Sequence, residues 1–408
     1  MSRTVEYSPG SGSGVAGDPA PPGPIRLTGL TGSDVGELLQ DMGCPAYRGR
    51  QIFSWLHSRL ASSFGGMSDL PLALRKRLAE IATITRLAVR EVSLSPDGTS
   101  KLVLGLEDGL VVEAVLIRGD RRLTACLSTQ VGCPLGCTFC MTGRVGFRRD
   151  LGADEIVAQL EAIQGAGAGR IANVVFMGMG EPLLNLRAVR RAIEVITDGA
   201  GAGIGTRHVT VSTVGIPSGI RELEALPGQT GLAVSLHSAV QRTRERIVPA
   251  AARWRLPELR EAIAHYSHAV NRPVTLEYCL IEGVNDSPAE AAALREYAGG
   301  LDCKVNLMAW NEVPGLPLKR PSESALLAFG RSISFGGGPT VLIRRSRGAG
   351  TAGACGQLGA SLLADGPGCR PSQGTKERRP PTVRPERSPS PARSRPRGSH
   401  SGEKKKSK

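Results

Sequence analysis

Residues 123–140 read LTACLSTQVGCPLGCTFC, a short β-type run followed closely by three cysteines, Cys133, Cys137 and Cys140. Similar β-type runs return up to residue 345, and patterns with apolar residues at three- and four-residue spacing lie between them. These runs lie at 172–178, 208–214, 232–237, 273–281, 304–310 and 340–345. Repeated β–α alternation predicts an α/β fold whose parallel sheet is closed or partly closed into a barrel, with its chemistry at the carboxyl ends of the strands.

The three cysteines predict a metal centre. Three thiolates within eight residues can bind one centre, but zinc normally takes four ligands and no fourth Cys or His lies nearby. A 4Fe–4S cluster held by three cysteines leaves one iron open for a cofactor. The C-x3-C-x2-C spacing, with an aromatic residue before the last cysteine, resembles the signature of radical S-adenosylmethionine enzymes. We therefore expect such a cluster here, rather than a zinc site or buried structural thiols.

The amino-acid composition indicates the compartment in which the protein works. Hydrophobic residues make up 40% of the 408 positions, enough for a large core, and we find no run of ~20 apolar residues that would cross a membrane. The N-terminal residues have no apolar segment typical of a secretory signal. Nine cysteines, an odd number, do not fit a secreted disulfide framework. These observations predict a cytoplasmic protein that does not enter a membrane.

The chain divides into five predicted segments. Residues 1–24 are rich in Gly, Pro and Ser and are expected to be disordered, 25–90 show helical patterns, and 91–120 form a β-rich connector. Residues 121–360 form the barrel, and 361–408 form a basic low-complexity tail. From residue 370 onward this tail carries +10 of the formal net charge of +14. It either contacts nucleic-acid phosphates without reading bases or is only a solvated tail.

Several motifs occur together in one order. They are residues 45–57 (PAYRGRQIFSWLH), 124–156 (TACLSTQVGCPLGCTFCMTGRVGFRRDLGADEI), 176–185 (FMGMGEPLLN), 209–217 (VTVSTVGIP), 232–238 (LAVSLHS), 305–311 (VNLMAWN) and 354–358 (ACGQL). From about Leu27 to Leu358 the chain resembles the RlmN/Cfr family of radical S-adenosylmethionine RNA adenine methyltransferases, and its RlmN branch more closely. The resemblance implies a partial (β/α) barrel with an N-terminal helical module that binds RNA.

The resemblance also implies an activity and its cofactors. The expected reaction is methylation of carbon 2 of adenosine in 23S rRNA and tRNA, with one 4Fe–4S cluster, two S-adenosylmethionine molecules per methylation and an electron donor such as flavodoxin. Methylation at carbon 8, as in the Cfr branch, is one alternative. A non-catalytic RNA-binding factor that keeps the fold is another, although the intact cysteines argue against it.

Three residues outside the cluster motif match catalytic positions of the family. Cys355 matches the cysteine that carries the methyl group, and Cys126 matches the thiol that resolves a covalent protein–RNA adduct by forming a disulfide. Glu113 matches the general base of that step. Taken singly, either thiol would be read as part of the core and Glu113 as a carboxylate on an edge strand.

A further set of residues matches the family's S-adenosylmethionine pocket, and each lies near the end of a predicted strand. The set is Gly180, Glu181, Ser212, Ser235, Leu236, His237 and Asn311. Alone, residues 178–182 could be a simple strand-to-helix turn and His237 a buried core histidine. Four other cysteines match no motif and are expected to be structural: Cys44, Cys279, Cys303 and Cys369.

The segment before Cys355 departs from the family pattern. Residues 347–354 read RGAGTAGA, whereas the family usually has acidic residues here. We expect this segment to be more flexible and less charged than in the family.

Overall fold

The computed structural model describes residues 23–119, 122–167, 169–226 and 228–364. The chain divides into two units, 1–366 and 367–408, and all the described residues belong to the first. The predicted N-terminal disorder and basic tail lie almost entirely outside the described residues.

The N-terminal part is a small helical module with its own core. Its capping box, in which Thr31 and Asp34 bond each other's backbone amides, starts the first helix. A short parallel pair of strands joins the beginning and the end of the module. These elements are α1 (Gly32–Asp41), α2 (Tyr47–His57), α3 (Leu72–Ile81), β1 (Ile25–Arg26) and β2 (Ala82–Thr83). Apolar side chains of the three helices pack together, which explains the three- and four-residue spacing in the sequence.

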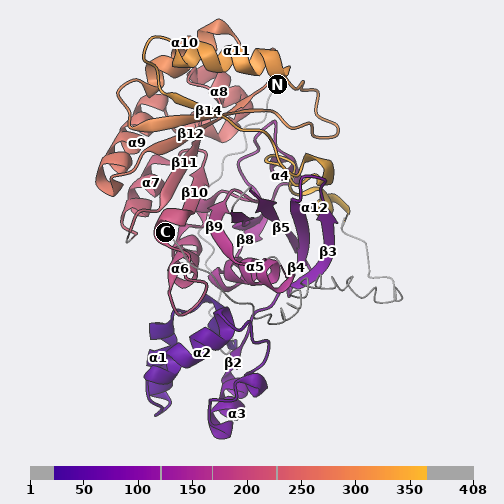
Figure 1. The fold of residues 1–408 in the computed structure, drawn as a ribbon, viewed down its shortest axis with the longest axis vertical. Coiled ribbons are helices and arrows are strands. Elements are labelled where there is room, and N and C mark those ends of the chain that lie inside the picture. The colour runs from indigo at the N-terminus through magenta and orange to yellow at the C-terminus, as the bar shows by residue number, and fades with distance from the viewer. Residues whose placement is uncertain (1–22, 120–121, 168, 227, 365–408) are drawn as a thin grey trace, which may run out of the picture. The chain divides into compact units, whose positions relative to one another are not determined.

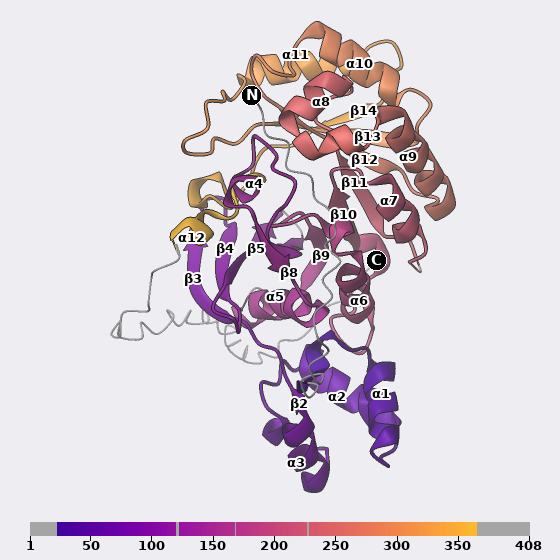
Figure 2. The same ribbon diagram turned by 180° about the vertical axis from the view of Figure 1, so that it is seen from behind.

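Within the described residues, ten strands form one sheet (Figures 1 and 2). Its parallel part is β6 (Leu123–Cys126), β9 (Ile171–Phe176), β10 (Val209–Thr213), β11 (Gly231–Ser235), β12 (Val274–Leu280), β13 (Cys303–Ala309) and β14 (Thr340–Ile343). Each of these strands falls within or overlaps a β-type run of the sequence. The order β6-β9-β10-β11-β12-β13-β14 follows the chain, and β14 does not pair back to the other edge. The expected α/β fold with a partial barrel is therefore confirmed.

Residues 91–120 are more than a connector. The strands β3 (Ala88–Leu94), β4 (Ser100–Gly105) and β5 (Val111–Arg118) continue the same sheet as an antiparallel extension, and β5 pairs with β6. Tight turns at Gly98 and Gly109, both with positive φ, connect the three strands. We call β3, β4 and β5 the platform.

Helices between the parallel strands complete the barrel part of the chain. They are α5 (Ala153–Gly165), α6 (Leu186–Thr197), α7 (Pro217–Glu224), α8 (Gln241–Ile247), α9 (Leu256–Val270), α10 (Pro288–Ala298) and α11 (Glu323–Ser334). In the two ribbon views, α6, α7 and α9 lie along the outer face of the parallel strands. No described helix is long and apolar enough to cross a membrane.

The helical module contacts the barrel part through buried ionic and polar groups. Glu161 on α5 bonds His57 at 2.8 Å and Arg86 at 2.5 Å, and Glu161 and His57 are almost fully buried. Asp154, also on α5, accepts hydrogen bonds from Arg26 at 3.1 Å and Thr85 at 2.7 Å. One helix thus holds the module through two carboxylates.

Candidate active site

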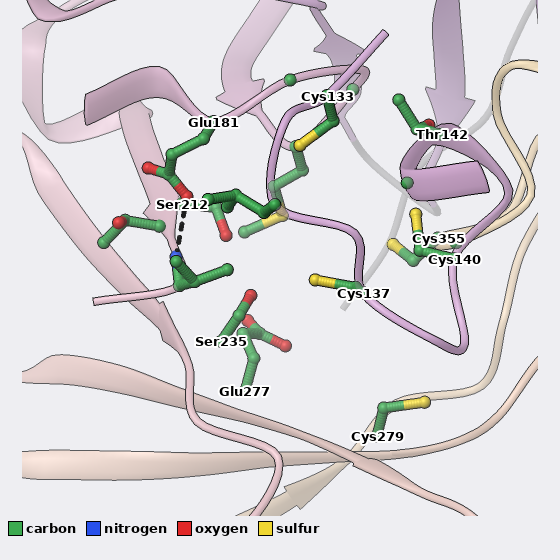
Figure 3. Close-up of a pocket in the computed structure, with 18 of the residues that line it drawn as sticks. Cys133, Cys137, Cys140, Thr142, Glu181, Ser212, Ser235, Glu277, Cys279 and Cys355 are labelled. Atoms are coloured by element: carbon green, nitrogen blue, oxygen red, sulfur yellow. Dashed lines mark hydrogen bonds between the residues drawn. The ribbon is translucent and has the colours of Figure 1, made fainter. Parts of the chain in front are cut away.

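The three motif cysteines face one large pocket at the carboxyl ends of the parallel strands (Figure 3). Cys133, Cys137 and Cys140 lie on the loop between β7 (Gln130–Gly132) and α4 (Met141–Val145). The empty volume of the pocket is about 1010 Å³, part of it open to solvent. A pocket that gathers three thiols at the carboxyl ends of parallel strands is the candidate cofactor site of this fold.

Backbone hydrogen bonds fix the cysteine loop. β7 pairs with β8 (Phe147–Asp150), and the Cys133 amide donates to the carbonyl of Gly146 at 3.1 Å. Gly132 has a φ of +79°, and a side chain there would overlap the Gly146 carbonyl oxygen. Glycine at 132 is therefore required for the approach that closes the loop.

The thiols fit a 4Fe–4S cluster. Burial raises the pKa of Cys133 to about 12 and also raises the pKa values of Cys137 and Cys140, so that bare thiols stay protonated at neutral pH. Iron would supply the positive charge that thiolates need at this buried position. Among the described residues, no three Cys, His, Asp or Glu side chains converge as ligands of a single ion. Separate thiols around one pocket suit a cluster with a different iron for each cysteine.

Among the residues expected to bind the cofactor, Glu181 is the one with an acidic side chain, and it lines this pocket. It is 2% exposed and accepts hydrogen bonds from the amides of Leu183 at 3.0 Å and Val214 at 2.9 Å, the latter drawn in Figure 3. Burial raises the pKa of Glu181 to about 7 despite these bonds. No described Lys, Arg or His forms a salt bridge with it, so the ammonium group of S-adenosylmethionine fits as its partner.

Most of the expected cofactor residues meet in the same pocket. Gly180, Ser212, Ser235 and His237 line it together with Glu181. The Cys279 amide donates to His237 Nδ1 at 3.1 Å, and burial lowers the pKa of His237 to about 3, so the imidazole is neutral. Two expected residues lie elsewhere. Leu236 is fully buried in the core, and Asn311 lines a second pocket.

The second pocket brings together the two thiols expected to take part in catalysis. Cys126, at the end of β6, and Cys355 both line it, with Asn311 and Arg344. Asn311 Nδ2 donates to the Cys355 carbonyl at 3.0 Å. Burial raises the pKa of Cys126 to about 12; Cys355 nearby raises it further and Arg344 lowers it. Cys355 also lines the first pocket, so it connects the cluster site with Cys126.

Glu113, the expected general base, is held away from both pockets. Its side chain is fully buried on β5, and Lys101 Nζ lies 3.5 Å from it. It accepts hydrogen bonds from the Gly359 amide at 2.9 Å and from Ser361, whose amide lies at 3.2 Å and hydroxyl at 2.6 Å. In this arrangement Glu113 bonds the segment that follows Cys355.

The sequence did not point to three further residues that line the first pocket. Cys279, expected to be only structural, is buried but faces this pocket (Figure 3), and Glu277 and Arg344 face it as well. Cys279 is the second-last residue of β12 and Arg344 directly follows β14, whereas Glu277 lies in the middle of β12. The rule that parallel strands present chemistry at their carboxyl ends could have identified Cys279 and Arg344, and a carboxylate within the otherwise uncharged run 274–280 is the signal for Glu277.

Comparisons with known proteins agree with this geometry. Residues 127–295 match the radical SAM superfamily, and residues 25–84 match the ribosomal RNA large subunit methyltransferase N-terminal domain. The dual-specificity RNA methyltransferase RlmN of Nitratidesulfovibrio vulgaris (strain DSM 19637 / Miyazaki F) is 44% identical over 79% of this chain and 91% of its own length. A probable dual-specificity RNA methyltransferase RlmN of Moorella thermoacetica is 43% identical over 82% of this chain and 97% of its own.

The fold also matches the solved structure of a radical SAM enzyme. The crystal structure of a radical SAM methyltransferase from Sphaerobacter thermophilus is 40% identical, has a TM-score of 0.78, and covers 82% of this chain and 99% of its own. The expected enzyme class, with its 4Fe–4S cluster and S-adenosylmethionine, is thereby confirmed. The chain belongs to the RlmN family of radical S-adenosylmethionine RNA methyltransferases.

Proposed function

We propose that this enzyme adds a methyl group to carbon 2 of adenosine in 23S rRNA and in tRNA. The observation that carries the proposal is the position of Cys355, which lines both the pocket of the three cluster cysteines and the pocket of Cys126. Carbon 2 is favoured over carbon 8 because residues 25–84 match the N-terminal domain of ribosomal RNA methyltransferases and the relatives are dual-specificity RlmN proteins.

The cofactor sites follow from the two pockets. Cys133, Cys137 and Cys140 would hold the cluster, and Gly180, Glu181, Ser212, Ser235 and His237 would hold S-adenosylmethionine. We include Asn311 through its hydrogen bond to the Cys355 carbonyl, and Leu236 through its backbone next to Ser235 and His237. When bound, these groups supply the radical that removes a hydrogen atom from a methyl group.

The two thiols of the second pocket would have successive roles. Carbon 2 of adenine is electron-poor and has no lone pair for ordinary methyl transfer, so the Sγ of Cys355 carries the methyl group first. The methyl carbon, after losing a hydrogen atom, bonds to carbon 2. Carbon 2 then gives up its hydrogen as a proton to Glu113, and the odd electron passes to a one-electron acceptor such as an oxidised iron–sulfur cluster. The Cys126 thiolate then attacks the Sγ of Cys355. The S–S bond forms as the bond between Cys355 and the carbon breaks, and the carbon gains a proton. Arg344 in the same pocket favours the thiolate of Cys126.

Glu113 keeps its predicted role as the general base that takes a proton while the adduct resolves. This role requires the carboxylate to leave Gly359 and Ser361 at that step, because both its oxygens accept hydrogen bonds from them in the structure. The enzyme would work in the cytoplasm on rRNA and tRNA and receive electrons from a small donor such as flavodoxin.

The proposal is tested by digesting RNA to nucleosides after reaction with the reconstituted enzyme and separating the products by chromatography and mass spectrometry. Formation of 2-methyladenosine in both 23S rRNA and tRNA is expected. Formation of 8-methyladenosine would assign the other branch of the family, and unmodified RNA from protein with a full cluster would contradict the proposal.

A further inference from the structure

Residues 347–361, the segment that carries Cys355, form hydrogen bonds on both sides of this cysteine to carboxylates of the platform and its turn, Asp97 and Glu113. Before Cys355, the Gly348 amide donates to Asp97 Oδ2 at 2.8 Å, in the turn between β3 and β4. After Cys355, the Gly359 amide and Ser361 donate to Glu113 on β5. Residues 347–354 contain no acidic side chain of their own, so both acidic acceptors come from the platform.

The buried carboxylate of Glu113 is well suited to form strong hydrogen bonds with this segment. A buried carboxylate is costly unless it is paired and hydrogen-bonded, and here Lys101 and three donors satisfy it. Two of these donors are backbone amides at the start of α12 (Ala360–Ala364), which lack partners within the helix. Hydrogen bonds to charged groups contribute more than neutral ones.

The same segment is hydrogen-bonded to the first two residues of α4, which directly follow Cys140 of the cluster loop. The Met141 amide donates to the Gly356 carbonyl at 2.8 Å, and the Thr142 hydroxyl donates to the Leu358 carbonyl at 2.6 Å. Residues 356 and 358 therefore contact α4 next to the loop of the cluster cysteines, while 359 and 361 contact Glu113. A shift of residues 359–361 would move Cys355 relative to that loop.

We propose that Glu113 is a positioning residue that holds the segment of Cys355 in place for methylation. Its carboxylate fixes residues 359–361, and this contact sets where the Sγ of Cys355 stands in the first pocket. This role acts before RNA binds and is separate from the proton transfer at the end of the reaction. It rests on the proposed function, because it assigns Glu113 to the step in which Cys355 receives its methyl group.

The test uses full-length enzyme with its cluster reconstituted under anaerobic conditions and no RNA. Hydrogen–deuterium exchange of the peptide covering residues 356–362 and the rate of methylation of Cys355 by S-adenosylmethionine are both measured by mass spectrometry. In Glu113→Ala, exchange is expected to rise about tenfold or more, because hydrogen bonds to a charged group are lost. Methylation of Cys355 is expected to slow by about the same factor, with the iron content unchanged.

Ser361→Ala provides a second variant that leaves Glu113 in place. It removes only the 2.6 Å hydroxyl contact, so exchange of the same peptide is expected to rise about threefold. Ser332→Ala is the matched control, since that exposed serine bonds the Phe329 carbonyl on α11, and it should behave as the wild type. If Glu113→Ala fails to fold, the exchange of residues 356–362 in Ser361→Ala tests the positioning role by itself.

Two results would overturn the positioning role. One is wild-type exchange at 356–362 in Ser361→Ala. The other is wild-type methylation of Cys355 in folded Glu113→Ala, with only the later release of RNA impaired. Because no RNA is present, the outcome does not depend on which carbon of adenosine is methylated. Failure of the proposed function would appear instead in the nucleoside analysis of the wild type.

Discussion

Cys126 and Cys355 line the same pocket, although one ends a strand in the middle of the sheet and the other follows the last strand. Cys355 alone of the two also faces the pocket of the cluster cysteines. The two thiols therefore have different surroundings, because Cys355 lines both pockets whereas Cys126 lines only the second pocket, at the end of β6. Different roles for the two thiols follow, and they can be separated by mutation.

Cys126→Ala and Cys355→Ala are expected to lose turnover equally but to accumulate different species. Cys126→Ala should still join RNA to Cys355 and should fail to release it, so the protein should purify with covalently bound, nuclease-sensitive RNA on denaturing gels. Cys355→Ala has no thiol to carry the methyl group and should purify without RNA. If both thiols were only structural, each loss would destabilise the core by a similar ~1–3 kcal/mol without this difference. Absence of RNA from folded, iron-loaded Cys126→Ala would contradict the assignment.

Removal of the cluster ligands should remove iron and activity together. Wild-type enzyme purified without oxygen is expected to be brown, with about four irons per chain. The combined change of Cys133, Cys137 and Cys140 to Ala should give colourless protein without methylation. Cys303→Ala, at the other end of β13 from the site, is the control and should keep its iron. A zinc-loaded, colourless wild type that still methylates RNA would exclude the cluster.

Glu113→Gln separates the base from the positioning role. The amide keeps an oxygen that can accept the Gly359 hydrogen bond, but it cannot take up a proton at neutral pH. Its NH2 group cannot accept from Ser361, so methylation of Cys355 should slow by about threefold, as expected for Ser361→Ala. Release of methylated RNA should slow far more, by about 10²–10⁴-fold. The measurement is a time course of covalent adduct and free product. Release at the wild-type rate would show that Glu113 is not the base.

The contact between the helical module and α5 should contribute strongly to stability. Glu161→Ala leaves Arg86 and His57 without their buried carboxylate, and we expect the free energy of unfolding to fall by about 2–4 kcal/mol. Glu107→Ala is the control, because its ion pair with Arg26 is largely exposed and should contribute less than about 1 kcal/mol. Urea unfolding followed by circular dichroism measures both. Equal losses in the two variants would show that Glu161 does not hold the module.

The sequence predicted the parts of the site that depend on local pattern. The cysteine loop has its own spacing. Four expected cofactor residues lie in the last residues of parallel strands or shortly after them, where the carboxyl ends meet at one edge: Glu181, Ser212, Ser235 and His237. Leu236 shows the limit of that rule. Successive side chains near the end of a strand point in opposite directions, so Ser235 and His237 face the pocket while Leu236 faces the core.

Other features depend on contacts between distant segments. Nothing in the sequence of residues 347–354 indicates that the Gly348 amide would donate a hydrogen bond to Asp97. Without that contact, the glycine-rich sequence predicts a flexible segment. The strand pattern of 111–118 likewise gives no sign that Glu113 would bond the segment after Cys355. No motif includes Cys279, so the sequence predicts a core thiol, yet the end of β12 brings its side chain into the first pocket.

The central claim is that the methyl group reaches carbon 2 of adenosine through Cys355, with loss of a hydrogen atom on the way. It is tested most directly by reaction with S-adenosylmethionine whose methyl group is fully deuterated, followed by mass spectrometry of the nucleosides. The account predicts 2-methyladenosine that keeps two of the three deuterium atoms of that group, because one is removed while the carbon is bound to Cys355. A methyl group with all three deuterium atoms, or label at carbon 8, would contradict it.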